Sequence, residues 1–491
     1  MNYKALIFLA WIPCVSFSQD FKTGSWKGDI QLSDTILKVD LHLLRLKDSI
    51  FTAFLMHPTE CFFCDSCFNG YELHLKSNRN ELYLRNENVK KRESYKQKKT
   101  RLYNDAKFIG SLAVNKNQLN GELTLDDKVF PVTLFRDSIP INRPQEPKRP
   151  FPYYWEKVFC RNPKDSIVLA GTLTLPQKEG KFPVVIFQTG SVPSNRDGDG
   201  NHHKHTLVVA DYLTRHGIGV LCYDSRGIGK STGNFYKSTP LDLSSDLLAW
   251  KKYLASRKEI ISSEIGIIGH SEGGMVAAMA ASQSSDFNFI VMLGTPGLKL
   301  RDVFEEQTRL RVESGEMSRE QFEFQQKGTQ KIYKLMELHQ DSKIIKDSLM
   351  KYKEEYISVY FDSIAKNPDK QPMLKRLYST IITIRSSPHN LFNLNLNPTD
   401  YLEKVTCPVL SLSGSNDRLV PSKANQEVIR QALTKAGNRN FQIIELEGLN
   451  HNFQECEKGT ITESLTLEQT FSPKALEIIT YWILFHLEQQ N

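Results

Sequence analysis

The chain has 491 residues, of which 40% are hydrophobic and 24% are charged, and its formal net charge is +7. These values are typical of a soluble globular protein with more than one domain, and they exclude a disordered or fibrous chain. The positive charge is spread along the sequence, and no dense basic stretch alternates with aromatic residues, so nucleic-acid binding is not indicated. The densest basic run, Lys90 to Arg101, is interpreted as a solvated loop.

The first 18 residues have the pattern of a secretory signal peptide. Lys4 supplies a positive charge, residues 5–15 are mainly apolar, and the small residues Ser16 and Ser18 stand where signal peptidase recognises its site. The apolar run is shorter than the ~20 residues that a membrane-spanning helix needs, so we expect no membrane span. Lipidation at Cys14 is a minor alternative. We therefore expect an exported bacterial protein, either periplasmic or extracellular.

Three cysteines, Cys61, Cys64 and Cys67, lie close together in the sequence. A structural zinc site needs four ligands, and neither a histidine nor a fourth cysteine is nearby. In an oxidising compartment a local disulfide is an equally good interpretation. We predict no metal site and leave the pairing open. Cys222 and Cys407 lie in or beside apolar runs and are predicted to be buried thiols.

Residues 19–137 consist of short segments with alternating apolar and polar residues, separated by turn residues such as Asn115 and Asn117. This pattern predicts a small antiparallel all-β domain, either a barrel or a sandwich. Residues 138–153 contain five prolines and are predicted to form a stiff, extended linker. The role of the β domain is open: it could bind substrate, contact glycan or other cell-envelope material, cover the active site, or only aid folding.

From residue 154 to residue 491 the pattern changes. A hairpin is followed by apolar, β-rich runs that alternate with helical segments, which predicts a mostly parallel sheet covered on both faces. Residues 297–400 are instead charged and helical, so we expect a helical insertion between two strands that forms a lid over the site. The strands are expected in these segments: FPVVIFQTG, IGVLCYD, IGIIGH, FNFIVMLGTP, CPVLSLSGSND and NFQIIELEG.

Ser271 lies in the sequence Gly-His-Ser-Glu-Gly, between an apolar strand and a helix of small residues. A serine at such a turn has an exposed hydroxyl, and the flanking glycines allow the neighbouring backbone to come close. Because the pattern is short, its sequence context decides whether Ser271 is a nucleophile. Asp417 and His451 each follow an apolar strand, in the chain order Ser, Asp, His that this kind of sheet uses for nucleophile, orienting carboxylate and base.

We therefore predict a catalytic triad of Ser271, Asp417 and His451. The oxyanion needs two backbone N–H donors. We assign one to Glu272, at the start of the helix after the nucleophile, and the other to Ser191, in the loop after FPVVIFQTG. No catalytic role is expected for the side chain of Glu272.

Five segments resemble motifs of the α/β-hydrolase superfamily, and within it the bacterial secreted esterases that are also similar to serine aminopeptidases. The family patterns are GSGPxDRD, YDxRGxGKS, GHSEGG, PVLxLxGxxDxxVP and GLNHxFQ. Here they correspond to residues 190–197, 223–231, 269–274, 408–421 and 448–454. Two departures concern the oxyanion loop, because Thr189 replaces a usual histidine and Val192 a usual glycine. Asp224 and Arg226 are expected to be structural by this resemblance.

The resemblance implies a doubly wound α/β-hydrolase domain and hydrolysis of a small-molecule ester through an acyl-enzyme, without a metal or organic cofactor. The segments before residue 137 also resemble the β domain that often precedes such esterases. We expect short- to medium-chain acyl esters. Two alternatives stay open: a secreted serine aminopeptidase or acyl-peptidase, and a non-catalytic hydrolase-like binding protein.

Two other patterns are set aside. The segment RGIGKST ends like a phosphate-binding loop, but Asp224 stands where that motif needs its first glycine. His202, His203 and His205 lie near the expected entrance of the pocket. We interpret them as part of a polar loop, with substrate contact as the next alternative and a metal site as the least favoured.

Overall fold

The structure is a computed structural model, which describes residues 142–200, 203–313, 333–339, 341–351 and 382–489, the single residues 319, 323, 330 and 379, and the strands between residues 8 and 136. The chain divides into two compact units, one of residues 1–142 with 353–381 and one of residues 143–352 with 382–491. The cysteines Cys61, Cys64 and Cys67 and the basic run from Lys90 to Arg101 lie outside the described residues.

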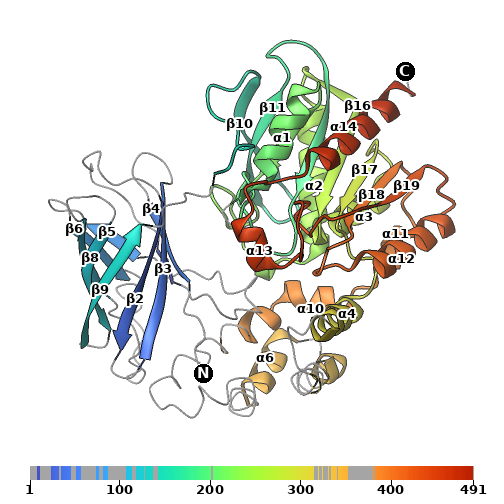
Figure 1. The fold of residues 1–491 in the computed structure, drawn as a ribbon. Coiled ribbons are helices and arrows are strands. Elements are labelled where there is room, and N and C mark those ends of the chain that lie inside the picture. The colour runs from blue at the N-terminus through green and yellow to red at the C-terminus, as the bar shows by residue number, and fades with distance from the viewer. Residues whose placement is uncertain are drawn as a thin grey trace. The chain divides into compact units, whose positions relative to one another are not determined.

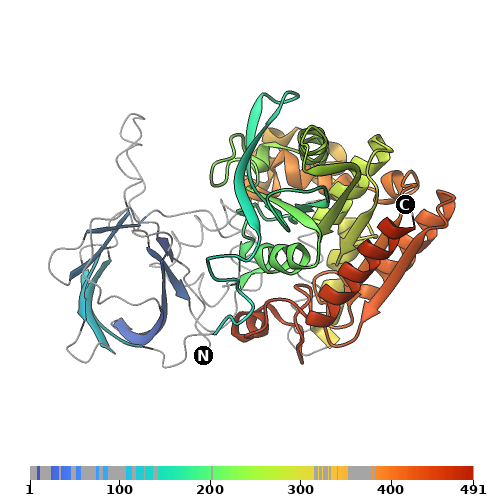
Figure 2. The same cartoon turned by 90° about the horizontal axis from the view of Figure 1, so that it is seen from above.

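The first unit contains an antiparallel sheet with the strand order β1-β4-β3-β2-β9-β8-β7-β6-β5, and this sheet is strongly curved (Figure 2). The antiparallel pairing agrees with the alternating sequence pattern, while a closed barrel or a sandwich stays a prediction. The signal-peptide prediction, whose segment includes β1, also stays a prediction. The strands are β1 (Phe8–Ala10), β2 (Gly24–Leu32), β3 (Thr35–Arg45), β4 (Phe51–Met56), β5 (Leu73–Lys76), β6 (Glu81–Asn86), β7 (Lys107–Leu112), β8 (Gln118–Leu125) and β9 (Lys128–Arg136).

The second unit is built on an eight-stranded sheet with the order β10-β11-β15-β12-β16-β17-β18-β19 (Figure 1). The hairpin of β10 and β11 is antiparallel, β11 pairs antiparallel with β15, and the remaining pairs are parallel. The strands are β10 (Tyr154–Asn162), β11 (Ile167–Leu175), β12 (Phe182–Gln188), β15 (Gly219–Tyr223), β16 (Ile260–His270), β17 (Ile290–Leu293), β18 (Val409–Gly414) and β19 (Phe441–Leu446), with a small ribbon of β13 (Asp199–Gly200) and β14 (His203–Lys204).

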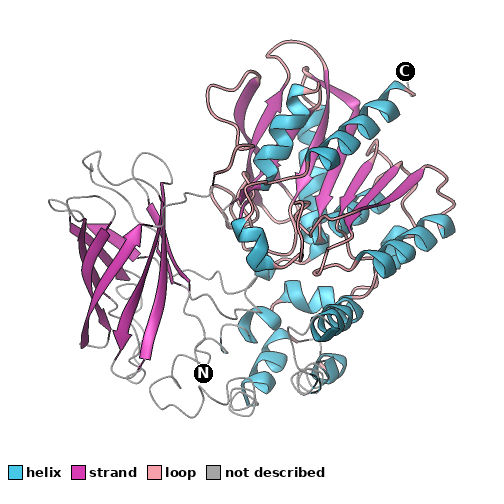
Figure 3. Ribbon diagram, in the orientation of Figure 1, coloured by secondary structure: helices cyan, strands magenta, loops and turns pink. Residues whose placement is uncertain are grey.

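Helices cover both faces of this sheet (Figure 3). One face packs against α1 (His205–Arg215) and α14 (Pro473–Glu488), and the other packs against α2 (Pro240–Ala255), α3 (Glu272–Gln283) and α12 (Ser422–Lys435). This arrangement confirms the prediction of a mostly parallel sheet between helical layers. Shorter helices are η2 (Phe235–Lys237), α11 (Thr399–Leu402) and α13 (Ile461–Thr466).

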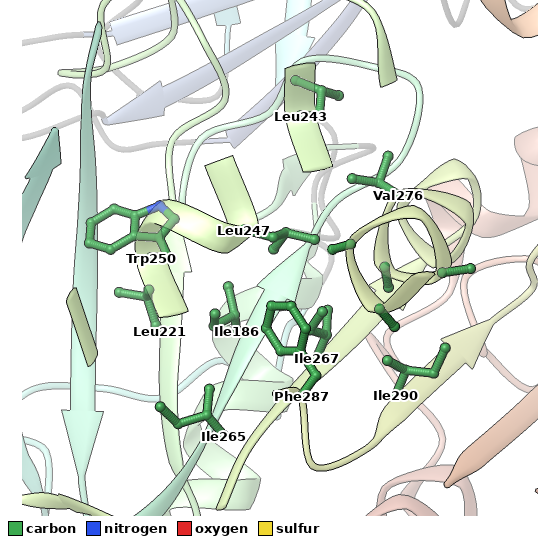
Figure 4. Close-up of a cluster of buried hydrophobic side chains, with 14 of the residues drawn as sticks. Ile186, Leu221, Leu243, Leu247, Trp250, Ile265, Ile267, Val276, Phe287 and Ile290 are labelled. Atoms are coloured by element: carbon green, nitrogen blue, oxygen red, sulfur yellow. The ribbon is translucent and has the colours of Figure 1, made fainter. Parts of the chain in front are cut away.

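The two cores follow from the sequence of the central strands. In β12 the side chains of Val184 and Ile186 belong to one core, and those of Val185 and Phe187 belong to the other. A parallel strand buried on both faces is apolar throughout, because successive side chains point to opposite faces. In the core shown in Figure 4, Trp250 lies over the sheet together with other apolar side chains of α2.

The insertion predicted at residues 297–400 contains the described helices α4 (Leu300–Glu313), α6 (Ser342–Lys351) and α10 (Pro388–Asn395). Their role as a lid stays a prediction.

The part of the predicted linker from Arg143 onward belongs to the second unit. Arg143 donates to the carbonyl oxygen of Leu465 at 3.2 Å, and the side chain of Gln145 bonds to the backbone of Phe471. Among the described residues, no helix has the length and apolar character to cross a bilayer.

The described cysteines Cys160, Cys222, Cys407 and Cys456 are free thiols. Cys222 is buried as predicted, and burial raises the pKa of its thiol. Cys407 is only partly buried, although burial still raises the pKa of its thiol to about 12.

Candidate active site

Ser271 occupies a sharp turn between β16 and α3. Its backbone has φ +57° and ψ −127°, a conformation that costs energy for a residue other than glycine. The backbone N–H of Ser271 donates to the carbonyl oxygen of Leu293 at 2.7 Å, which holds the turn against the end of β17. This geometry is the strand–turn–helix context that the sequence pattern predicts for a nucleophile.

The glycines on either side of Ser271 are required by close backbone contacts. A Cβ atom on Gly269 would lie 2.3 Å from the carbonyl oxygen of Gly273, and one on Gly273 would lie 2.3 Å from the carbonyl oxygen of Gln188. A real Cβ atom essentially never comes within 3.0 Å of an atom to which it is not bonded. The first turn of α3 therefore packs directly on the ends of β16 and β12, and only glycine permits it.

Asp417 and His451 form a buried hydrogen-bonded pair in the loops that follow β18 and β19. The Nδ1 atom of His451 lies 2.7 Å from Oδ2 of Asp417, and these residues are 9% and 3% exposed. The other carboxylate oxygen of Asp417 accepts from the backbone N–H groups of Leu419 at 2.9 Å and Val420 at 2.8 Å. A carboxylate held in this way keeps the proton of His451 on Nδ1, so Nε2 is the nitrogen that can accept a proton.

Two contacts connect this pair to the turn that carries Ser271. His270 donates from Nε2 to the backbone carbonyl of His451 at 2.9 Å, and the centres of the two rings are 4.8 Å apart. A Cβ atom on Gly294 would lie 3.2 Å from both Oδ2 of Asp417 and Nδ1 of His451, and Gly294 is adjacent in sequence to the residue that binds the N–H of Ser271. The fold thus brings the three predicted residues to one edge of the sheet.

The pKa of His270 is lowered to about 4, because the partly buried ring is desolvated and lies next to His451. His270 is therefore neutral at neutral pH, which fits its Nε2–H donating to a carbonyl oxygen.

The backbone segments that carry the predicted oxyanion donors both adjoin the nucleophile. Glu272 is the first residue of α3, and the first N–H groups of a helix have no partner within the helix. The loop after β12 passes directly against Ser271, since a Cβ atom on Gly190 would lie 3.0 Å from Cβ and 3.5 Å from Oγ of Ser271. Ser191 follows Gly190 and is exposed. Both backbone segments are thus near the position that a reacting acyl group would occupy.

The loop that departs from the family pattern is held by side chains of neighbouring strands. Thr189 accepts a hydrogen bond on its carbonyl oxygen from Nε2 of Gln188 at 2.9 Å, and the side-chain oxygen of Gln188 accepts from the hydroxyl of Tyr223. These bonds fix the backbone just before Gly190, where the family usually has a histidine.

The side chain of Glu272 has polar contacts that the sequence did not reveal. One carboxylate oxygen lies 2.9 Å from Nε2 of His389, and the other accepts from the amide of Asn393 at 2.6 Å. His389 and Asn393 are one turn apart on α10, so they share a face of that helix. The only sequence signal for them is this spacing of four residues within the charged insertion.

Asp224 and Arg226 have the structural contacts that were expected. Asp224 pairs with Arg196 at 2.6 Å and accepts from the backbone N–H of Lys230. The guanidinium of Arg226 forms two hydrogen bonds with Asp246, at 2.7 and 2.8 Å. Asp224 thus connects the segments that carry Arg196 and Lys230, and Arg226 connects its loop to α2.

The interpretation of the histidine segment as a polar loop is wrong for His203. Its side chain is fully buried, with Nδ1 at 2.9 Å from the hydroxyl of Thr470 and Nε2 at 2.9 Å from the amide of Gln454. His202 lies outside the described residues. Within the part of the chain that the structure describes, no three histidine, cysteine, aspartate or glutamate side chains are grouped to hold a metal ion.

Comparison with known proteins decides the family. The family model described as serine aminopeptidase, S33, matches residues 197–457, which is more than half of the chain. The chain belongs to this family. It is therefore an α/β hydrolase, as the motifs predicted, and the S33 match includes Ser271, Asp417 and His451.

Esterases are among the individual proteins to which this S33-family chain is similar. Esterase EstD of Thermotoga maritima is 30% identical over 141 residues, which are 29% of this chain and 34% of that esterase. The chain therefore matches about a third of the length of this curated relative. The Pyrococcus furiosus esterase Pf2001 has 19% identity and a TM-score of 0.41, covering 70% of this chain and 96% of that one. Est1E from Butyrivibrio proteoclasticus, solved with ferulic acid bound, has 18% identity and a TM-score of 0.37, covering 68% and 98%.

Proposed function

We propose that this S33-family hydrolase is an exported carboxylesterase that cleaves short- to medium-chain acyl esters through an acyl-enzyme on Ser271. The observation that carries the proposal is the buried hydrogen bond between Asp417 and His451 at the sheet edge that also bears Ser271. Acyl transfer by serine requires a nucleophile, a base that takes its proton and a carboxylate that orients the base. The strained turn of Ser271, His451 and Asp417 supply these three groups.

Each residue then has a defined role in the reaction. The hydroxyl of Ser271 attacks the acyl carbon while Nε2 of His451 takes its proton, and Asp417 stabilises the imidazolium that forms. The backbone N–H groups of Glu272 and Ser191 bind the oxyanion. His451 then protonates the leaving alcohol, and water, activated by the same histidine, releases the acid and restores Ser271.

The choice of esters over peptides is supported by the match to Esterase EstD. A second candidate, a serine aminopeptidase or acyl-peptidase, is favoured by the description of the family itself. The same triad cleaves both bond types, so the leaving group that the site accepts distinguishes them. A third candidate, a binding protein without catalysis, predicts no turnover at all.

The deciding experiment compares p-nitrophenyl esters from acetate to decanoate with aminoacyl anilides, using wild type and Ser271→Ala. We expect ester turnover in wild type and a loss of about 10³-fold or more in the variant. The matched control is Ser263→Ala, an exposed serine near the start of β16, the strand that precedes Ser271. Turnover of anilides alone would make the protein a peptidase. No turnover, together with no labelling of Ser271 by a fluorophosphonate, would favour the binding protein.

The assignment of Ser191 as a backbone donor has its own test. Ser191→Ala keeps the backbone N–H, so we expect kcat to stay within about threefold of wild type, whereas losing a real oxyanion donor costs about 10²- to 10³-fold. A large loss in this variant would mean that the hydroxyl, not the backbone, contacts the reacting group.

Export is tested by the mass of the protein recovered from its native compartment. We expect a mature chain that begins at Gln19, and an unprocessed N-terminus would contradict the proposal. We also propose that the β-strand unit contacts glycan or other cell-envelope material, which pull-down with isolated envelope fractions would test.

A further inference from the structure

The residue that follows the nucleophile holds a buried charge. Glu272 is 8% exposed, and its carboxylate contacts two residues of α10. Nε2 of His389 is 2.9 Å from one carboxylate oxygen and donates to the other at 3.3 Å. Asn393 donates to the latter oxygen at 2.6 Å. A helix of the predicted insertion is thus joined by polar contacts to the first residue of α3.

His389 is placed to carry a positive charge. Its second ring nitrogen, Nδ1, lies 3.2 Å from the carbonyl oxygen of Ser238, and a carbonyl oxygen can only accept. Because Nε2 also faces an acceptor, both nitrogens must bear protons to satisfy both bonds. Burial lowers the pKa of His389, but the charge of Glu272 and its hydrogen bond outweigh this and leave the pKa raised. His389 is 1% exposed, so water does not screen the pair.

The groups around His389 are these. Glu272 faces it from α3, the Ser238 carbonyl faces it from the loop after η2, and the ring of Phe235 lies 4.3 Å away between ring centres. The hydroxyl of Ser238 accepts from the guanidinium of Arg226 at 3.1 Å. Glu272 is therefore the negative charge that His389 neutralises.

This pairing matters for catalysis because of where the carboxylate is attached. The backbone N–H of Glu272 is the proposed oxyanion donor, so an unneutralised carboxylate on the same residue would repel the negative charge that develops on the substrate. The same contacts also restrain the first turn of α3, whose N–H direction determines how well the donor points at the oxyanion.

Resting on the proposed function, we propose that Glu272 and His389 are positioning residues. Their ion pair, supported by Asn393, aims the Glu272 N–H at the oxyanion and cancels the carboxylate charge beside it, so that docking of α10 controls the reactivity of Ser271.

The test uses the full chain and four variants: Glu272→Gln, His389→Gln, the double variant and the control Asn395→Ala. Asn395 is on α10, but its amide bonds to Leu391 in its own helix and not to Glu272. We measure kcat and KM for the preferred ester, the rate at which a fluorophosphonate labels Ser271, and the melting temperature.

We expect His389→Gln to lower kcat and the labelling rate about tenfold, with KM within about twofold, because it leaves a buried carboxylate uncompensated beside the oxyanion donor. Glu272→Gln should lose less, because a neutral amide can still bond to Asn393. The double variant should be at least as active as His389→Gln alone, since the uncompensated charge is gone, which makes the two losses non-additive. Asn395→Ala should match wild type.

The pH dependence of kcat gives a readout that a purely structural role would not change. Wild type should lose activity at high pH as His389 loses its proton, and Glu272→Gln, which has no charge to neutralise, should lack this loss. The proposal is overturned if the variants melt earlier but keep wild-type kcat, labelling and pH profile, or if the two losses simply add.

Failure of the proposed function gives a different result. If wild type neither turns over esters or anilides nor reacts with the fluorophosphonate, both proposals fall, because there is no oxyanion to stabilise. If wild type is active and Ser271→Ala is not, the esterase mechanism stands, and the variants of Glu272 and His389 alone decide the positioning role.

Discussion

The carboxylate of Asp417 binds His451 with one oxygen, at 2.7 Å from Nδ1, and two backbone N–H groups with the other. Three donors therefore hold a carboxylate that is almost fully buried. Such a group cannot rotate away from the histidine without losing bonds in a place where water cannot replace them. The orientation of the His451 ring thus depends on the loop after β18.

Asp417→Asn should leave the fold intact and remove most of the activity. An amide can donate to Nδ1 and so favours the wrong tautomer of His451, for which a loss in kcat of about 10⁴-fold is typical. Steady-state kinetics on the preferred ester measure it. The control is Asp400→Asn, an exposed residue whose carboxylate bonds to Asn397 and which should be as active as wild type. A loss of less than tenfold in Asp417→Asn would assign another carboxylate to His451.

Gly294→Ala should disturb the active site specifically. Gly294 has φ +56°, and an added Cβ would lie 3.2 Å from both Asp417 and His451, so these side chains must shift. Gly437 is a matched control, because its φ is +71° but nothing lies within 4 Å of the Cβ position. Both variants should lose about 1 kcal/mol or more of stability from backbone strain. Only Gly294→Ala should also lower kcat, by at least about tenfold, since a misplacement of catalytic groups has effects of this size. Equal kcat values would show that the space beside Gly294 is not critical.

His270 should make the protein less stable in mild acid. Its pKa in the folded state is about 4, below the ordinary value of 6.5, so the unfolded state binds a proton that the folded state does not. Stability is therefore lost as the pH falls from 6.5 toward 4. His270→Gln keeps a donor for the His451 carbonyl but does not titrate. Thermal melts between pH 7 and pH 4.5 should show a smaller drop in melting temperature for the variant, and parallel curves would contradict the prediction.

Arg226→Ala should lower stability severely. The guanidinium is 4% exposed and bonds to Asp246, to Asp165 and to the backbone of Asp242. Its removal leaves the Asp246 carboxylate buried and without its cation, which costs about 3–5 kcal/mol. The exposed Lys435, paired with Glu403, is the control, and Lys435→Ala should cost less than about 1 kcal/mol. Chemical denaturation gives both values, and similar losses would mean that Arg226 contributes no more than a surface ion pair.

The local sequence was sufficient for the residues at the ends of the strands. Ser271, Asp417 and His451 each follow an apolar run that was predicted to be a strand, and parallel strands place their carboxyl ends at one edge. The order of the three signals therefore predicted their meeting. The role of the glycines around Ser271 was also predicted correctly. They allow close backbone contacts that a side chain would prevent.

Contacts between distant segments could not be predicted in this way. Glu272 and His389 are separated by more than a hundred residues, and His389 stands in a charged helical insertion in which no pattern marks a buried face. His203 was interpreted as part of a polar loop, yet it is buried against Gln454, far along the chain. A polar side chain is buried only where another segment supplies its hydrogen-bond partner, and the sequence around it does not contain that partner.

The sequence by itself determined the sheet, the serine turn and the order of the candidate triad, because strand periodicity and glycine requirements act over a few neighbouring residues. Tertiary structure alone decided which polar groups are buried together, since a buried charge or donor is stabilised when a remote element supplies its partner. The pairing of Asp417 with His451 could be predicted from the sequence, and the structure gives the hydrogen bond between them. The Glu272–His389 ion pair was found only in the tertiary structure.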